Sequence, residues 1–309
     1  MVRIEQLASP RILAGAPGDI YMYPYVTGAL LTGTPTSLTV AVTDEAGNTV
    51  VASTAATWDS TNKRLTLALT AAQNDVPKAL TATWGFTAHA TDGAGVYSLV
   101  TKHESVGEVL FTEAEARVYD NSALSNTTTY PADSLLRLRD QVTDSFEDII
   151  GIGLGARYER DVLDGTGKPA LMLSRSGVLT LRSVAERTAG SATFTAYSAG
   201  NLADILVYPH GRLERETLGS FANGKRNVAV VYEHGLSPIP LDLRRAGLRI
   251  LRNLAIPTNT SDRMLSQTTT LGVERLAVAG LREGAWFGIP PVDSVLQFYR
   301  DRYLVPTVR

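Results

Sequence analysis

The first candidate for chemistry in this chain is a glycine-rich segment, Gly151-Ile-Gly-Leu-Gly-Ala156, which fits the dinucleotide-binding pattern G-x-G-x-x-A. That pattern binds a pyrophosphate where a strand precedes it and a helix follows it, because the helix N-terminus supplies the N–H donors. Here a helical pattern precedes the segment, and a strand-like pattern follows from Tyr158. We therefore interpret the glycines as a helix end and a loop, and we expect no cofactor.

The histidines do not form a metal-binding or catalytic pattern. They are His89, His103, His210 and His234, and no two of them have the spacing of metal ligands on one helix. The chain has no cysteine, so thiolate metal sites and disulfides are excluded. A G-x-S-x-G nucleophile motif is also absent from the sequence. We expect no catalytic, metal or cofactor site, and therefore a protein that is not an enzyme.

Carboxylates follow one another along a predicted helix over residues 131–150. This acidic set contains Asp140, Asp144, Glu147 and Asp148. Such a set is usually a solvated helix face, and in an oligomer it can also be a partner face or the wall of a lumen. A catalytic carboxylate pair would need a cleft, and nothing in the pattern selects one.

Arginines form a second charged set on a predicted helix over residues 242–255. Arg245, Arg249 and Arg252 lie at i, i+4 and i+7, so they share one side of the helix. The opposite face is apolar and contains Leu243, Ala246, Ile250 and Leu254. The arginines can face solvent, pair within the chain, or contact carboxylates of another subunit. Phosphate contact is the least favoured of these, because no aromatic residues are interleaved with the arginines.

The elements that must position these residues differ between the two parts of the chain. Residues 12–110 are poor in charge and alternate apolar with small polar residues, which predicts strands over 37–43, 49–52, 64–69, 80–87 and 95–101. Turn residues separate these strands. The spacing predicts an antiparallel β-sandwich of immunoglobulin-like type, with Trp58 and Trp84 in its core.

The composition changes near residue 108, where we place a domain boundary between residues 1–108 and 109–309. Thr112-Glu-Ala-Glu115 is a capping box that opens a short helix ending near Asp120. Further strands are predicted over 158–163, 179–184, 192–197, 205–208, 212–215 and 227–232, with a turn at 199–201. The C-terminal part is thus predicted to be an α+β domain, a small helical bundle with a β-rich insert.

Apolar residues continue at helical spacing near the C-terminal end of the chain. They predict a helix over 294–303, followed by an extended tail over 304–309. Their apolar groups must be buried, either within the chain or by docking onto another protein. The candidate docking residues are Trp286, Phe287, Val292, Val295, Leu296, Tyr299, Tyr303, Leu304, Val305, Val308 and Arg309.

The bulk composition is that of an ordinary soluble globular protein. The 309 residues are 44% hydrophobic and 19% charged, with a formal net charge of −2, so the chain as a whole has no attraction for nucleic acid. No apolar run is long enough to span a membrane. The first residues lack the basic and apolar regions of a secretion signal, so we expect folding in a cytoplasm.

From about residue 111 onward, the order of elements resembles the head–tail connector (adaptor) proteins of long-tailed double-stranded DNA phages. The resemblance rests on the acidic helix Asp133–Ile150, the β-rich insert, and the strand–turn–helix segment from Val230 to Ala246. Its strongest part is Gly288-Ile-Pro-Pro-Val-Asp-Ser-Val-Leu296, with Tyr299-Arg300 after it. The N-terminal sandwich lies outside the resemblance, and the β-rich insert matches the family least well.

The resemblance implies a structural virion protein at the head–tail interface. Such proteins form a ring, typically of twelve copies, beneath the portal, and DNA passes through it without sequence-specific binding. The implied partners are the portal protein, tail-side neck or tail-terminator proteins, and further copies of the chain. The family's portal-binding C-terminal tail corresponds to residues Val292–Arg309 here, and the acidic set and the arginines are candidate opposite faces of a ring interface.

Two other interpretations stay open at this stage. The chain can be another neck or tail-terminator component that carries an adhesive immunoglobulin-like domain. It can also be a carbohydrate-active enzyme in which the sandwich is a binding module. Portal binding distinguishes the connector from the first alternative, and oligomeric state distinguishes it from the second.

Overall fold

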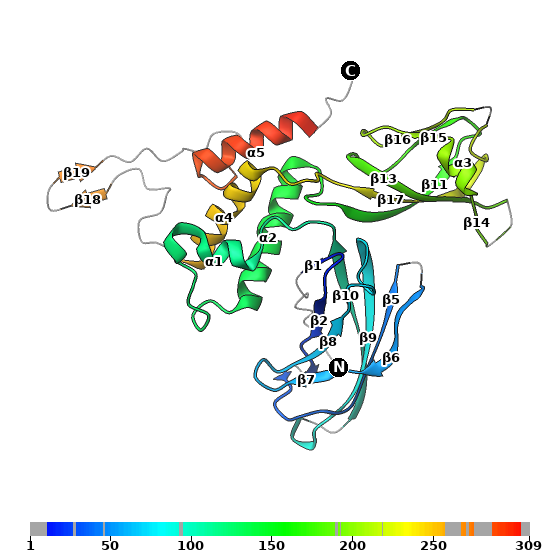
Figure 1. Ribbon diagram of the computed structural model, residues 1–309. Coiled ribbons are helices and arrows are strands. Elements are labelled where there is room, and N and C mark those ends of the chain that lie inside the picture. Colours follow the sequence, from blue (N-terminus) through cyan, green and yellow to red (C-terminus); the bar gives the residue numbers. More distant parts are fainter. Residues whose placement is uncertain are drawn as a thin grey trace. The chain divides into compact units, whose positions relative to one another are not determined.

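The computed structural model describes residues 11–26, 29–45, 47–92, 95–188, 191, 193–217, 219–256, 267–269, 272–274 and 286–303. The chain forms two compact units, and Figure 1 labels their elements. Unit 1 contains residues 1–108 and 155–235, and unit 2 contains residues 109–154 and 236–309. The predicted boundary near residue 108 coincides with the first passage between the units. The β-rich insert, which the sequence placed with the helices, groups with the N-terminal part instead.

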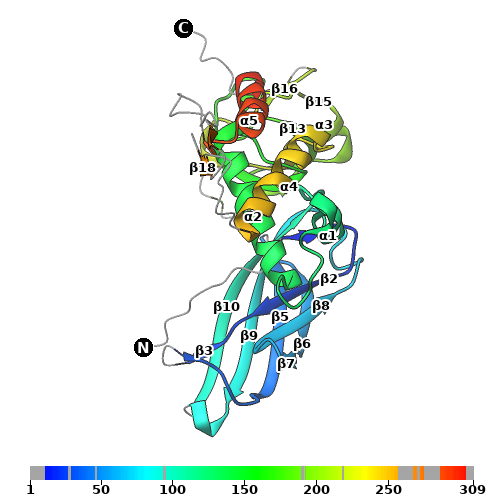
Figure 2. The same cartoon turned by 90° about the vertical axis from the view of Figure 1, so that its left-hand side faces the viewer.

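The N-terminal part of unit 1 is built from two main sheets (Figures 1 and 2). The five-stranded sheet has the order β1-β10-β9-β5-β6, with β1 at Ile12–Leu13, β10 at Gly95–Val106, β9 at Lys78–Ala88, β5 at Thr36–Asp44 and β6 at Thr49–Ala55. The three-stranded sheet has the order β2-β8-β7, with β2 at Gly18–Met22, β8 at Arg64–Leu69 and β7 at Thr57–Asp59. The short strands β3 (Tyr25–Val26) and β4 (Ala29–Leu30) pair with each other.

Both sheets contribute to one apolar core because alternate residues of each strand point inward. In β9, Leu80, Ala82, Trp84, Phe86 and Ala88 are all buried. They cluster with Ile20 and Met22 of β2 and with Leu65 and Leu69 of β8. The expectation for the tryptophans is confirmed: Trp84 is fully buried, and Trp58 packs partly buried against the same core.

A buried polar chain runs through this core. Trp84 Nε1 donates to Thr101 Oγ1 at 2.8 Å, and Thr101 Oγ1 lies 2.6 Å from His103 Nε2. Because the Trp84 donor occupies one lone pair of the hydroxyl, Thr101 can donate its own proton to His103. Burial lowers the pKa of His103 from 6.5 to about 4. The imidazole is therefore neutral at neutral pH and is part of the packing of the sandwich.

The β-rich insert adds two smaller sheets to unit 1. One has the order β11-β17-β13-β14, with β11 at Arg157–Gly165, β17 at Gly224–His234, β13 at Val178–Glu186 and β14 at Thr195–Ala196. The other has the order β12-β16-β15, with β12 at Ala170–Met172, β16 at Arg212–Arg215 and β15 at Ile205–Val207. The predicted turn at 199–201 is wrong: these residues begin helix α3 (Ala199–Ala203), because the Ser198 hydroxyl accepts from Asn201 N and caps it.

Unit 2 is a helical body. Its helices are α1 (Glu113–Ser122), α2 (Ala132–Ile150), α4 (Leu241–Ala255) and α5 (Pro290–Tyr303), and a short hairpin joins β18 (Gln267–Thr269) to β19 (Gly272–Glu274). The predicted capping box is confirmed: Thr112 Oγ1 accepts from Glu115 N, and Glu115 Oε2 accepts from Thr112 N at 2.7 Å. Helix α5 begins at Pro290, a turn earlier than expected, because proline fits a first helical turn.

One apolar core joins these helices. Phe146 of α2, Leu243 and Leu251 of α4, and Leu296 of α5 are fully buried in it. Gly247 of α4 allows the close approach of the chain before α1, because an added Cβ would lie 2.7 Å from a methyl of Leu110. The prediction was wrong for one residue of the apolar face of α4. Leu254 is exposed, because it lies on the last turn of the helix, beyond the residues that pack into the core.

The β-rich insert leaves and re-enters the helical body at neighbouring points. Gly151 adopts a left-handed conformation with φ of 78° and ends α2, as its glycine predicted. The chain then pairs with itself, since Leu154 and Leu236 form a parallel bridge and Leu236 N donates to Gly153 O at 2.8 Å. The glycine-rich segment is thus the exit of a helix, and strand β11 is the element that follows it directly.

Candidate assembly surfaces on the helical unit

The C-terminal helix α5 is bound to its own chain. Val292, Leu296 and Tyr299 are buried in the core of unit 2, and Val295 and Tyr303 pack against that core. The Tyr299 hydroxyl also donates to both carboxylate oxygens of Asp242 in α4, at 3.0 and 3.2 Å. Burial, and then this hydrogen bond, raise the pKa of Tyr299 to about 12. The apolar stripe of α5 therefore fills the helical core, which was the intrachain alternative.

The aromatic pair before α5 fastens the start of that helix. Phe287 lies edge-on to Phe146 of α2, with 5.6 Å between the ring centroids. Its backbone N–H donates to Asp293 Oδ1 at 2.9 Å. The Arg300 guanidinium lies over the Trp286 ring at 5.4 Å, a cation–π contact within the segment. Of the other predicted docking residues, Leu304, Val305, Val308 and Arg309 lie outside the described part of the chain.

One large apolar side chain of α5 is left at the surface. Phe298 is 56% exposed and lies edge-on to the neighbouring Tyr299 ring. The sequence analysis did not select Phe298, because this residue lies off the apolar stripe formed by Val295, Tyr299 and their neighbours on the helix. A surface phenylalanine on a docked helix is a candidate contact with another protein.

The acidic set of α2 divides into residues with different surroundings. Glu147 Oε1 accepts from Leu154 N at 2.7 Å, so this carboxylate holds the loop that follows the helix. Asp140 lies 2.8 Å from the Nε of its neighbour Arg139 and is half-buried. Asp144 and Asp148 are exposed. Of this set, the exposed Asp148 is the carboxylate best placed to meet another molecule.

The arginines of α4 divide in the same way. Arg252 Nε lies 2.9 Å from Asp120 Oδ2 of α1, so it is paired within the chain. Arg249 is half-buried, and Arg245 is exposed. Arg244, which sequence reasoning did not select, pairs with Glu115 of α1 at 3.7 Å and donates to Ile239 O. Spacing within one helix could not predict these ion pairs, because the acidic partners of the α4 arginines lie on α1.

The segment that holds Asp120 has an unusual backbone. Asp120, Asn121 and Ser122 all have positive φ, of 51°, 56° and 62°. Non-glycine residues adopt this region at a cost of about 1 kcal/mol or more each. The ion pair with Arg252 and the close packing of α1 against α4 fall at this point. The true helix therefore ends one turn before the end of α1, near the predicted end at Asp120.

A buried polar cluster in the insert contains residue types found in hydrolases. Asp161 accepts from the Tyr232 hydroxyl at 2.9 Å, from Ser174 N at 2.8 Å and from Ser174 Oγ at 2.7 Å. A nucleophilic serine would instead donate to a histidine base. His234 lies 3.8 Å from Glu159, and burial followed by Arg175 and Arg157 lowers its pKa to about 4. The cluster fixes strands β11 and β17 to the loop after β12.

The rest of the described structure offers little for small-molecule chemistry. An open depression of about 610 Å³ lies on the insert, lined by Pro169, Arg215, Glu216, Thr217 and Gly219. Its arginine is already 3.6 Å from Asp204. Among the described residues, no group of His, Asp or Glu side chains could hold a metal ion. Within the same residues, no helix is both long and apolar enough to cross a membrane.

Comparison with known proteins gives distant structural similarity only. No protein-family model and no curated protein matches the chain. A solved chain from the neck of an empty GTA particle, computed with C6 symmetry, is 16% identical over 53% of this chain and 77% of its own length, with a TM-score of 0.34. One from the neck of a native GTA particle, computed with C12 symmetry, is 14% identical over 56% and 86%, with a TM-score of 0.35.

A third similar chain belongs to the virion of a native gene transfer agent (GTA) particle. It is 16% identical over 58% of this chain and 79% of its own length, with a TM-score of 0.35. Function is therefore inferred below from the residues and contacts of this chain.

Proposed function

We propose that this chain is a structural virion protein that forms a ring beneath the portal, extends the DNA channel and joins a phage head to its tail. The observation that carries the proposal is the convergence of three separate segments in one helical body. Residues 132–150, 241–255 and 290–303 carry the connector resemblance, and their side chains share one apolar core. The β-rich insert leaves and returns through the paired Leu154 and Leu236.

The helical body has charged groups suited to a heterologous ring interface. Such a ring needs two different complementary faces on each subunit. Asp148 of α2 and Arg245 of α4 are exposed, whereas Glu147 and Arg252 are bound within the chain. We propose that Arg245 of one subunit meets Asp148 of the next. The chain has no enzymatic role in this proposal, and its sandwich, immunoglobulin-like in its two-sheet arrangement, faces outward as a decoration.

The portal contact is proposed to follow α5 rather than to consist of it. Val292, Leu296 and Tyr299 already fill the chain's own core. The remaining candidates are the exposed Phe298 and the residues after Tyr303, namely Leu304, Val305, Val308 and Arg309.

A pull-down on the portal of the same phage tests this proposal. The full-length chain is compared with a version that ends at Tyr303 and with the full-length variant Phe298→Ala. Ending the chain before α5 would be a poor test, because it would remove Leu296 and Tyr299 from the core. Loss of binding with the shortened chain supports portal docking through the tail. Failure of even the full-length chain to bind would overturn the adaptor proposal and favour a neck or tail-terminator role.

Ring assembly is tested by a charge exchange. Arg245→Glu should prevent ring formation on the portal, and the double variant Arg245→Glu with Asp148→Arg should restore part of it. Arg160→Glu, on the insert, is the control. Unchanged rings in Arg245→Glu, counted by electron microscopy, would contradict the proposed interface.

A further inference from the structure

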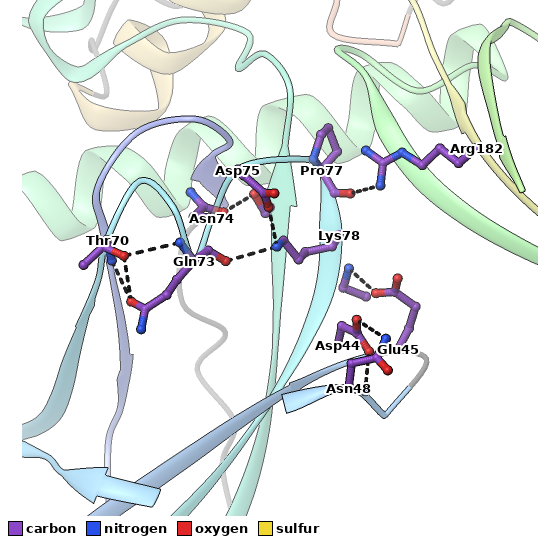
Figure 3. Close-up of polar contacts among 12 residues, drawn as sticks. Asp44, Glu45, Asn48, Thr70, Gln73, Asn74, Asp75, Pro77, Lys78 and Arg182 are labelled. Atoms are coloured by element: carbon purple, nitrogen blue, oxygen red, sulfur yellow. Dashed lines mark hydrogen bonds and ion pairs between the residues drawn. The ribbon is translucent and has the colours of Figure 1, made fainter. Parts of the chain in front are cut away.

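One of the contacts between the β-rich insert and the N-terminal sandwich is made by Arg182. Arg182 of β13 donates through Nε and Nη2 to Glu233 Oε1 of β17, at 2.9 and 2.5 Å. Its remaining terminal nitrogen, Nη1, donates to Pro77 O at the start of β9, at 3.1 Å (Figure 3). Only about 20% of the Arg182 side chain is exposed. Glu233 thus holds the guanidinium in position, and the Nη1 nitrogen of Arg182 reaches the sandwich.

A second contact lies beside the first. The Arg182 guanidinium lies over the Tyr158 ring of β11, 5.4 Å from its centroid. The Tyr158 hydroxyl hydrogen-bonds to Glu45, in the turn between β5 and β6. Glu45 in turn accepts from Ala79 N at 2.9 Å. Burial and the Glu45 carboxylate raise the pKa of Tyr158, so the hydroxyl stays a protonated donor.

The loops that present these acceptors are held by their own hydrogen bonds, which Figure 3 shows. Lys78 Nζ lies 2.7 Å from Asp75 and donates to Gln73 O at 3.0 Å. Thr70 N donates to the Gln73 side chain at 2.9 Å. Asp44 accepts from Asn48 N at 2.8 Å and closes the turn that contains Glu45. The acceptors for Arg182 and Tyr158 are therefore preorganised.

Further polar contacts between the two parts lie among the described residues. Gly107 N donates to Ala156 O at 2.8 Å, and Arg157 Nε lies 3.6 Å from Glu104, which also binds Arg11 at 3.0 Å. The apolar cores are separate: one contains Trp84 and its neighbours, the other Tyr232 and its neighbours. An interface without a shared apolar core permits relative motion of the parts it joins.

We propose that the N-terminal sandwich is an arm latched onto the β-rich insert by Arg182, Tyr158 and Glu104, and that it swings free when this polar latch opens. The chain passes from the sandwich into unit 2 after Glu108, and it reaches the insert only from unit 2. The insert is thus held to the sandwich by noncovalent contacts alone. Arg157 and Glu104 form an ion pair across this interface, so its attraction weakens and the latch opens more often as ionic strength rises.

Spin labels on the two parts test this directly, since the chain contains no native cysteine. Thr54→Cys on β6 and Leu206→Cys on β15 place labels at exposed sites on either side. The full-length protein should give one narrow distance distribution at low salt and a second, broader population at high salt. Arg182→Ala should increase the open population by at least about tenfold, as expected for the loss of roughly one charge-assisted hydrogen bond.

Two further variants keep the test decisive. Arg182→Lys retains a charge for Glu233 but not the forked geometry, so it should open the latch without unfolding the insert. Arg212→Ala removes a comparable ion pair with Glu214 that lies wholly within the insert, and it should leave the distances unchanged. The proposal is overturned if Arg182→Lys and Arg182→Ala both keep the narrow low-salt distribution, or if salt leaves the native distribution unchanged.

Discussion

Two sets of contacts in this molecule differ in their chemistry: one is apolar and the other is polar. In unit 2, helices from distant parts of the chain share one apolar core around Phe146 and Leu296. In unit 1, the sandwich and the insert keep separate cores and meet through Arg182, Tyr158 and Glu104. Apolar burial is insensitive to salt at ordinary concentrations, whereas exposed ion pairs weaken as salt rises. The comparison teaches that the helical body is permanent and that the attachment of the sandwich is adjustable.

The largest effect is expected from breaking the apolar contacts. Phe146→Ala should lower the free energy of unfolding of the helical unit by about 3–5 kcal/mol, because it removes a fully buried ring and its contact with Phe287. Phe298→Ala is the matched control, since that ring is 56% exposed and should change stability by less than about 1 kcal/mol. Denaturant unfolding followed by helical circular dichroism measures both. Equal losses would mean that Phe146 is not central to the core.

Acid should lower the stability of unit 1 more than that of unit 2. All four histidines lie in residues assigned to unit 1. The pKa values of His103 and His234 are lowered by burial from 6.5 to about 4, so the unfolded state binds more protons between these values. The contribution of each histidine to the free energy of unfolding is fully present above pH 6.5. It is lost as the pH falls toward 4, by up to about 3 kcal/mol per histidine.

Unfolding measured from pH 7 to pH 4 checks this expectation. The transition of the β-rich unit should move to lower denaturant, while that of the helical unit should move less. His103→Gln should flatten the pH dependence of the first transition. If the stability of the β-rich unit depends on pH equally in this variant and in the native protein, His103 is not the cause of the pH dependence.

The smallest effect is expected at the start of α1. Thr112→Ala removes the side-chain half of the capping box and should cost about 1 kcal/mol of helical-unit stability. Thr128→Ala, on the exposed loop before α2, serves as the control and should have little effect. If thermal unfolding shows the same midpoint for both variants, the cap does not limit the stability of this helix.

Local structure was largely predictable from the sequence. The alternation of Arg64–Leu69 and of Arg212–Arg215 predicted strands with the bounds that the structure has. Thr112 and Glu115 predicted a helix start because a capping box needs only four neighbouring residues. Strands β7 and β12 were missed, since three residues are too few to establish a period of two.

Long-range placement was less predictable. The apolar spacing of Val292, Leu296 and Tyr299 indicated that these residues must be buried, but it could not say against which chain. The grouping of the insert with the sandwich depends on Arg182 and Pro77, far apart in the sequence, and a backbone carbonyl leaves no trace in residue type. Likewise, the exposed Arg245 and the paired Arg252 look alike in sequence, because the partner Asp120 lies in another helix.

The way the chain passes between its two units has a mechanical consequence. It crosses at Glu108–Val109, Leu154–Gly155 and Gly235–Leu236, and the last two crossings lie side by side through the bridge between Leu154 and Leu236. A pulling force on the insert is therefore shared between two covalent strands, whereas a force on the sandwich passes to unit 2 through Glu108–Val109. A chain that connects two units once would concentrate that tension in a single linker. The paired strands at Leu154 and Leu236 therefore distribute tension on the insert without requiring a larger interface.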